Sequence, residues 1–238
     1  SKSINSATSS VAYSNWRYNE TTGNSNAPEL SVSDYSIPHR IVASLSYGKE
    51  YAKRFKSTVS LVYTGQSGAP YNVTYYGDLN GDGSNGNDLV FIPTDEQIDA
   101  MQFKATPKLD ADQQKADLKA FLGSAKYLKD HRGEYYERNS DRMSFEHHFD
   151  FRFLQDFKFR VAKETHTLQF SVDIMNVGNL LNRKWGLESY MSNNSYSPIT
   201  YSKGGEFQYT QGDKYDPFKE ISNISSRWRC QLGLRYIF

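Results

Sequence analysis

Residues 227–238 read Arg-Trp-Arg-Cys-Gln-Leu-Gly-Leu-Arg-Tyr-Ile-Phe, and this stretch decides the fold class. Its even positions carry Trp, Cys, Leu, Leu, Tyr and Phe, whereas its odd positions carry three Arg, Gln, Gly and Ile. Successive side chains of a β-strand point to opposite faces. The alternation therefore predicts a strand with one apolar face and one polar, largely cationic face.

The stretch 145–160 repeats this alternation over a longer run, with Phe at most odd positions and mainly polar or charged residues at even ones. Such a run exceeds the usual strand of about five or six residues and reaches the roughly 9–11 residues of a tilted membrane strand. The whole chain predicts six strands, near residues 3–14, 39–48, 57–74, 145–160, 165–180 and 227–238.

Composition narrows the class of protein. The 238 residues are 37% hydrophobic and 15% aromatic, and no window approaches the roughly 18 uninterrupted apolar residues of a membrane helix. A membrane barrel needs only alternate apolar residues, so this average is compatible with one. With 28 basic and 27 acidic residues the formal charge is +1, and we expect no nucleic-acid partner. The single cysteine, Cys230, excludes an internal disulfide.

The predicted connections alternate in length. Residues 48–57 and 161–165 are short turns, whereas the loops 15–38, 77–144 and 182–226 are long. In an up-and-down meander this puts the short turns at one rim and the long loops at the other, as in outer-membrane barrels. We therefore expect an all-β fold, with residues 1–238 forming the C-terminal portion of one transmembrane antiparallel β-barrel domain. Six strands are fewer than the eight of the smallest barrels, so the rest of the barrel must come from elsewhere.

Three motifs and the chain ending carry a resemblance to a known family. Residues 87–93 read Asn-Asp-Leu-Val-Phe-Ile-Pro, residues 132–139 read Arg-Gly-Glu-Tyr-Tyr-Glu-Arg-Asn, and residues 173–182 read Asp-Ile-Met-Asn-Val-Gly-Asn-Leu-Leu-Asn, followed by Trp185-Gly186. In this order they resemble the C-terminal barrel of TonB-dependent outer-membrane transporters, of the SusC/RagA-like and Oar-like groups of Bacteroidota. Such transporters have about 22 strands. The ending resembles the terminal aromatic signature that barrel assembly machinery recognises, carried here by Gly233, Tyr236 and Phe238.

The resemblance implies a function and partners. It implies part of an importer of nutrients such as oligosaccharides or peptides, in the outer membrane of a Gram-negative bacterium with its long loops extracellular. The implied partners are the missing barrel and plug, the TonB energy-transducing complex acting through that plug, outer-membrane lipids and a surface lipoprotein. The plug and TonB box have no counterpart in these residues, so this chain would contribute wall, lumen surface and loops.

The stretch 78–88 begins like a calcium-binding loop, with oxygen ligands at alternate positions and glycine in sixth place. Its twelfth position is Leu89, where an EF-hand has a bidentate Glu. The alternative interpretation is a plain turn cluster of Asx and Gly residues. The candidate Ca²⁺ ligands are Asp78, Asn80, Asp82, Ser84 and Asp88.

Two further sets of side chains are candidates for function. Polar residues on one face of the strands are expected to face an aqueous lumen: Glu146, His148, Asp150, Arg152, Arg229 and Arg235. Successive same-face residues lie about 7 Å apart, so a hydrogen-bonded network is favoured over a metal site at His148. Aromatic residues of the third long loop are candidates for contact with ligand, with packing inside the loop as the alternative: Trp185, Tyr190, Tyr196, Tyr201 and Tyr209.

Helical spacing appears between residues 94 and 129. Thr94 and Gln97 resemble a capping box, and Leu118, Phe121 and Leu122 form a short apolar stripe. We expect short helices within the second long loop, docked by that stripe onto the barrel mouth.

The sequence carries no recognisable catalytic motif. The stretch 65–68, Gly-Gln-Ser-Gly, lacks the spacing of a nucleophile elbow, and no HExxH or Cys/His pattern occurs. We expect that the chain is not an enzyme. Two alternatives to the importer stay open: a non-transporting outer-membrane barrel for adhesion or assembly, and a secreted β-sandwich lectin with its apolar rows facing across a dry core.

Overall fold

The computed structural model describes residues 1–5, 9–189, 191, 195–202, 204–209, 220–221, 224 and 226–238. The chain divides into two compact units. The first, here called the loop unit, contains residues 1–36, 69–143 and 190–219. The second, here called the sheet unit, contains residues 37–68, 144–189 and 220–238.

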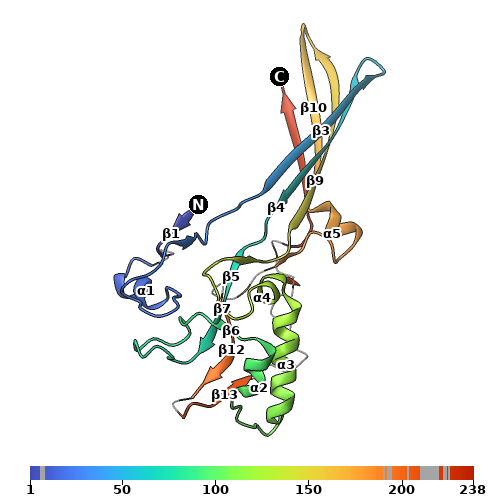
Figure 1. The fold of residues 1–238 in the computed structure, drawn as a ribbon. Helices are drawn as coiled ribbons and strands as arrows, with labels where there is room; N and C mark the ends of the chain where they lie inside the picture. The colour runs from blue at the N-terminus through green and yellow to red at the C-terminus, as the bar shows by residue number, and fades with distance from the viewer. Residues whose placement is uncertain are drawn as a thin grey trace. The chain divides into compact units, whose positions relative to one another are not determined.

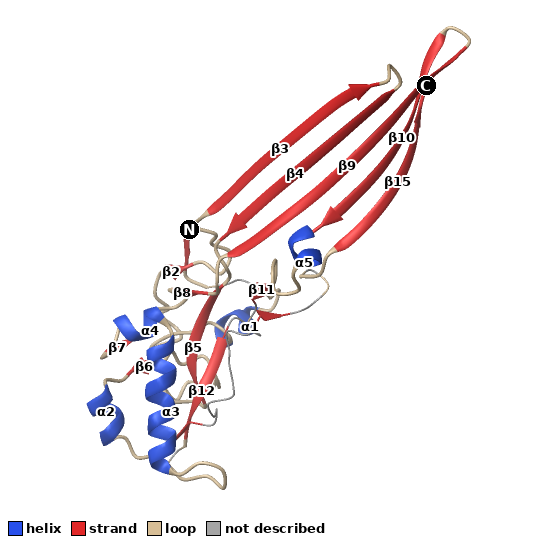
Figure 2. Ribbon diagram, turned by 90° about the vertical axis from the view of Figure 1, so that its right-hand side faces the viewer, coloured by secondary structure: helices blue, strands red, loops and turns tan. Residues whose placement is uncertain are grey.

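The sheet unit is built on one five-stranded antiparallel sheet (Figure 2). Its strands lie in the order β15-β10-β9-β4-β3, so β15 and β3 are its edges. Their bounds are β3 Arg40–Tyr51, β4 Phe55–Gln66, β9 Glu146–Val161, β10 Glu164–Met175 and β15 Arg229–Ile237. Five of the six predicted strands therefore contribute to this sheet, and every neighbouring pair is antiparallel, as expected.

Two tight turns and two long connections join these strands, as predicted. Residues 52–54 connect β3 to β4, and residues 162–163 connect β9 to β10. Ala52, Lys53 and Ala162 adopt positive φ angles of 50°, 56° and 56°, the left-handed conformation that closes tight hairpins. Because consecutive strands are antiparallel neighbours, both turns lie at one end of the sheet and both long connections leave from the other.

The pairing register aligns the apolar rows of all five strands on one face. Leu232 pairs with Val172, Val172 with Phe153, Phe153 with Val59, and Val59 with Tyr47. A one-residue slip at any pair would turn that strand's apolar row to the opposite face. The period-two pattern and the observed register therefore agree.

The sheet unit also contains a short helix and a two-stranded pair. Helix α5, Val177–Leu181, follows β10 directly, and β11, Glu188–Ser189, pairs with β14, Glu220–Ile221. In the described part of the chain, no helix is both long enough and apolar enough to cross a membrane.

The loop unit is a mixture of short strands and helices (Figure 1). Its four-stranded sheet has the order β13-β12-β5-β8. The strands of this unit are β1 Lys2–Ser3, β2 Ser31–Val32, β5 Pro70–Tyr76, β6 Phe91–Ile92, β7 Glu134–Tyr135, β8 Asp141–Arg142, β12 Ser195–Tyr201 and β13 Phe207–Tyr209. Its helices are α1 Ala12–Arg17, α2 Asp95–Ala100, α3 Ala111–Ser124 and α4 Lys126–Asp130.

Most residues of this unit were expected to form long loops, yet the unit has its own core. Val73, Ile92, Leu118, Leu122, Leu128 and Ile199 are almost fully buried in one hydrophobic cluster. The apolar stripe of α3 lies in this core, where Phe121 packs edge-on against Tyr196 at a ring separation of 5.4 Å. Docking onto a barrel mouth is therefore not needed to bury it.

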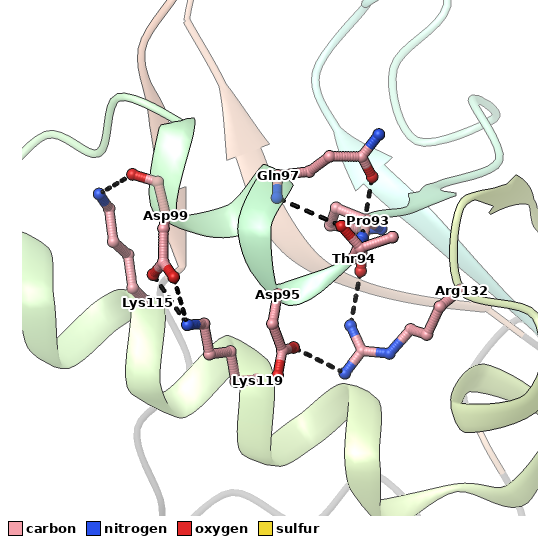
Figure 3. A network of polar contacts seen from close by, with 8 residues as sticks. All are labelled: Pro93, Thr94, Asp95, Gln97, Asp99, Lys115, Lys119 and Arg132. Carbon is pink, nitrogen blue, oxygen red and sulfur yellow. Dashed lines mark hydrogen bonds and ion pairs between the residues drawn. The ribbon is translucent and has the colours of Figure 1, made fainter.

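Helix ends in the loop unit are held by polar contacts (Figure 3). Thr94 and Gln97 form the predicted capping box at the start of α2. Arg132 reaches the same turn, donating to the Pro93 carbonyl at 2.6 Å and lying 3.5 Å from the Asp95 carboxylate. These contacts tie α2 to the stretch 132–139, far along the chain.

Three expectations about the elements need correction. The strand expected near 3–14 is replaced, among the described residues, by β1 and α1. Asn15 exchanges hydrogen bonds with the Ser9 backbone, a local contact that competes with strand pairing. The strand expected at 57–74 is two strands, interrupted where Gly68 and Pro70 punctuate the sequence. Pairing is also not antiparallel throughout, since β5 and β12 pair in parallel among the described strands.

Candidate functional site

The five-stranded sheet carries the most unusual surface of the described chain. Its apolar face remains exposed: Leu45 is 73% exposed, Leu232 66% and Leu234 73%. Contiguous apolar patches of more than a few hundred Å² are rare on soluble monomers and mark a surface that meets another apolar medium.

An aromatic row crosses this face at the end of the sheet that carries the tight turns. Neighbouring rings lie 5.2–5.9 Å apart along the whole row: Tyr51, Phe55, Phe157, Phe159, His166, Tyr236 and Phe238. The hydroxyl of Tyr236 also lies 2.7 Å from His166 Nδ1. The row includes two of the three residues assigned to the C-terminal signature, Tyr236 and Phe238.

A second aromatic group lies at the opposite end of the same face. Tyr63 packs against Phe149 at 4.9 Å and against His147 at 6.1 Å, and Phe145 lies 5.0 Å from His147. Gly65 leaves room for the Tyr63 ring, since a Cβ at this position would clash with the Tyr63 hydroxyl oxygen. Between the two aromatic groups the face carries mainly aliphatic side chains and Phe.

The opposite face of the sheet is polar and internally paired. Arg152 Nε lies 3.0 Å from Asp173 on β10, and Gln169 donates to Asp156 at 2.7 Å. At the turn end, Lys158 pairs with Glu50 at 2.7 Å.

All six polar residues predicted to share this face do so by register. Glu146 accepts from Gln66 at 3.1 Å, and Asp150 accepts from the Asn176 backbone N–H at 2.8 Å. No group of three His, Cys, Asp or Glu side chains in the described residues is arranged to hold a metal ion. Glu146 and Asp150 thus each accept a hydrogen bond.

The stretch 173–186 forms the structured end of β10. Asn176 has a φ of 53°, and its side-chain amide donates to the carbonyls of Gly186 at 2.8 Å and Ser226 at 3.0 Å. Asn179 donates to the carbonyls of Arg183 and Trp185 at 3.1 and 3.0 Å. Asn176 and Asn179 therefore hold the turn that follows β10 by hydrogen bonds to its carbonyl groups.

The stretch 132–139 has a structural role in the loop unit. Arg138 is almost fully buried and donates to the carbonyls of Ser3 and Ile4 and to Asn19. Asn139 donates to the Val32 carbonyl at 2.8 Å and to Asp34 at 2.6 Å. These two side chains attach the first 36 residues to the unit, which the sequence alone did not indicate.

The loop aromatics predicted to contact ligand occupy different positions. Tyr196 and Tyr209 are buried in the core of the loop unit, which favours the packing alternative for both. Tyr201 is partly exposed and packs against Phe207 at 5.4 Å, whereas Trp185 is exposed on the sheet unit. Tyr190 lies outside the described residues.

One acidic cavity of about 240 Å³ lies within the loop unit. Burial raises the pKa of Glu20, on its wall, to about 7, and the negative charge of Asp34 acts in the same direction. The cavity is lined by Glu20, Thr21, Thr22, Glu29, Ser31, Leu89, Tyr135, Tyr136, Glu137 and Arg138.

The strongest candidate for a functional surface is therefore the two-faced sheet, with its aromatic groups at both ends. Comparison of the chain with models of protein families, with curated proteins and with solved structures finds no match.

Proposed function

We propose that the sheet unit is part of the wall of an outer-membrane β-barrel, with its apolar face against lipid and its polar face toward an aqueous lumen. Following the family resemblance of the three motifs, we further propose that this barrel belongs to a TonB-dependent nutrient importer. The long connections and the loop unit built from them would then lie on the extracellular side.

The exposed apolar face is the observation that carries this proposal. In a β-sandwich the rows containing Leu45, Leu232 and Leu234 would be covered by a second sheet, yet these side chains are exposed. Lipid hydrocarbon covers such a face without requiring a protein partner. The exposure therefore favours the barrel over the lectin alternative.

The dimensions of the apolar face agree with a bilayer. Phe149 and Phe159, in the two aromatic groups, are ten residues apart on β9, about 34 Å along a strand. A strand tilt of about 40° reduces this to about 26 Å, close to the roughly 25 Å band of membrane barrels. The aromatic groups would then lie at the two membrane–water interfaces, where Tyr and Trp are enriched.

The edges of the sheet point to further strands. β3 and β15 each have one neighbour, so each leaves a row of backbone N–H and C=O groups unpaired within the described sheet. In hydrocarbon every such unpaired group costs several kcal/mol. We propose that the remaining strands of the barrel pair with both edges.

The single native thiol provides a direct test. Cys230 is exposed and shares the apolar face with Leu232, whereas Gln231 lies on the polar face. In native outer membranes, a charged, membrane-impermeant maleimide should label Cys230 at least about tenfold more slowly than the thiol of a C230S/Q231C variant, because thiolate formation requires water. A lipid-soluble maleimide and detergent-solubilised protein serve as controls for access. Equal labelling of both positions by the charged probe would overturn the barrel proposal.

The importer assignment is tested separately. Protein extracted from its native membrane should carry, on the same polypeptide, a plug and a TonB-box segment, and should associate with the TonB complex. A barrel without these parts would remove the importer assignment, leave the membrane proposal intact and favour the adhesion or assembly alternative.

A further inference from the structure

In the stretch 78–88, backbone N–H groups donate hydrogen bonds to carboxylates of the same stretch. Asp78 accepts from the backbone N–H groups of Gly81 at 2.7 Å and Gly83 at 3.0 Å. Asp82 Oδ1 accepts from the Ser84 backbone N–H at 2.7 Å. The second oxygen of Asp82, Oδ2, accepts hydrogen bonds from side chains.

Side chains from two distant segments converge on Asp82 Oδ2. The amides of Asn87 and Asn80 lie 2.9 and 3.3 Å away, and the hydroxyl of Ser25 also donates to it. Each of these side chains carries an oxygen that a hard cation accepts as a ligand. An amide presents its oxygen in place of its nitrogen after a simple flip.

Two buried oxygen atoms on consecutive residues of this loop have no hydrogen-bond donor. They are Asn87 Oδ1 and Asp88 Oδ1, on side chains whose residues are only 2% and 4% exposed. Both side chains enter the loop, since Asn87 donates to Asp82 and Asp88 Oδ2 accepts from the Leu79 backbone N–H at 2.7 Å. A buried acceptor without a donor is destabilising, and a cation would satisfy both atoms.

The negative charges of the loop carboxylates are not balanced by ion pairs in the described residues. Asp78, Asp82 and Asp88 place three carboxylates within the stretch 78–88. Among the residues that the structure describes, none of these three carboxylates forms an ion pair with Lys or Arg. Three neighbouring negative charges without a cation favour the binding of one.

We infer that this loop binds one calcium ion through Asp82, Asn87 and Asp88, together with Ser25 from the N-terminal segment. No set of three carboxylate, imidazole or thiol groups forms a metal site in the described chain, so amide and hydroxyl oxygens have to complete the ligand set. Calcium accepts such mixed oxygen ligands in irregular geometry, whereas magnesium requires a regular octahedron and zinc prefers His and Cys. The ion would attach segment 23–25 to the loop, which lies 57 residues further along the chain at Asp82.

Calorimetric titration of the full-length, detergent-solubilised and chelator-treated protein tests this inference. We expect one saturable site for calcium with a Kd of about 10⁻⁴–10⁻³ M, the range of extracellular modules. Magnesium should bind at least about tenfold more weakly. Absence of calcium binding, or equal affinity for both ions, would overturn the inference.

A matched pair of variants locates the ion. Asp82→Asn keeps the shape of the loop but removes a charged ligand, and it should weaken calcium binding about tenfold or more. Asp112→Asn, an equal charge change on the exposed start of α3, should bind like the parent protein. Unchanged affinity in Asp82→Asn would contradict the assignment.

Hydrogen exchange gives a second readout that does not depend on the variants. Saturating calcium should slow amide exchange in peptides covering residues 21–26 and 78–88, while peptides covering α3 should exchange unchanged. Uniform slowing across the loop unit, or none in these two segments, would argue against a local site. Neither result bears on the membrane proposal.

Discussion

The two units of this chain place similar apolar side chains in opposite surroundings. In the loop unit Leu118 and Leu122 are 0% exposed within a packed core. In the sheet unit Leu45 and Leu234 are both 73% exposed on one face of a single-layered sheet. The first arrangement is that of a domain folded in water, and the second is the one we propose for contact with lipid. Composition averaged over both units conceals this difference.

The pattern of each segment explains why the two units differ. Apolar residues at positions 118, 121 and 122 share one side of a helix, so they can be buried against neighbours from other segments. In β9 the apolar residues alternate with Glu, His, Asp and Arg, so burying both faces would bury charge. In such a sheet the charged face has to meet water, whereas the apolar face can meet lipid or other apolar groups.

The largest expected effect concerns the core of the loop unit. Leu118→Ala should lower the free energy of unfolding of that unit by about 2–5 kcal/mol, because it leaves a cavity among fully buried side chains. Leu30→Ala, at a residue 60% exposed in the same unit, should change it by less than about 0.5 kcal/mol. Denaturant unfolding followed by hydrogen exchange in α3 measures both. Equal losses of stability in Leu118→Ala and Leu30→Ala would contradict the assignment of Leu118 to a packed core.

The next effect tests the sheet face. Leu232→Lys should destabilise the folded barrel in lipid by about 2–4 kcal/mol, the cost of a cation near the middle of the apolar band. Gln231→Lys, on the opposite face of β15, should be nearly neutral because water solvates it there. Equilibrium unfolding from bilayers, or the amount of each variant assembled in the outer membrane, distinguishes the two. A neutral Leu232→Lys would place that face in water.

The free energy of unfolding of the loop unit should depend on pH through Glu20. Burial raises the pKa of Glu20 from 4.5 to about 7, so the folded state retains a proton that the unfolded state releases. The stability from this group is fully present below about pH 4.5 and is lost as pH rises through 7. We expect a loss of about 1–3 kcal/mol across that window, reduced by the partial exposure of the side chain. Glu20→Gln should abolish this slope in urea unfolding measured between pH 4 and 8, whereas an unchanged slope would assign it to other groups.

The smallest effect concerns a helix end. Thr94→Ala removes the hydroxyl that accepts from the Gln97 backbone N–H and should destabilise the loop unit by about 1 kcal/mol. Thr94→Ser, which keeps the hydroxyl, should recover most of that loss. Thermal unfolding of both variants measures the difference, and an equal melting temperature for Ala and Ser would show that the cap is unimportant.

Sequence periodicity predicted the sheet strands well, because period two is a local property. The strand expected at 145–160 is observed at Glu146–Val161, and that expected at 39–48 runs to Tyr51. The same method failed where local patterns were weak. It gave one strand across Gly68 and Pro70, and it did not decide between ligand contact and packing for Tyr196 and Tyr209, which are both buried.

The loop unit could not be predicted, because its contacts connect segments far apart in the chain. Arg138 donates to Ser3 and Ile4, and Asn139 donates to Val32 and Asp34, across more than 100 residues. A polar residue in a loop gives no local sign of whether its partner is water or a distant carbonyl. The convergence of Ser25 with Asp82 was hidden for the same reason, although the oxygen-rich pattern of 78–88 was visible.

The sequence by itself determined which side chains share a face, where the tight turns lie and that each long strand has one apolar and one polar side. These follow from the alternation of side chains along an extended backbone, which needs no knowledge of neighbours. Tertiary structure decided that the five apolar rows align on one face, and that residues from the two long connections form a separate packed core. Both depend on pairing between segments that are distant in sequence. Local residue patterns do not specify which distant segments pair or in which register.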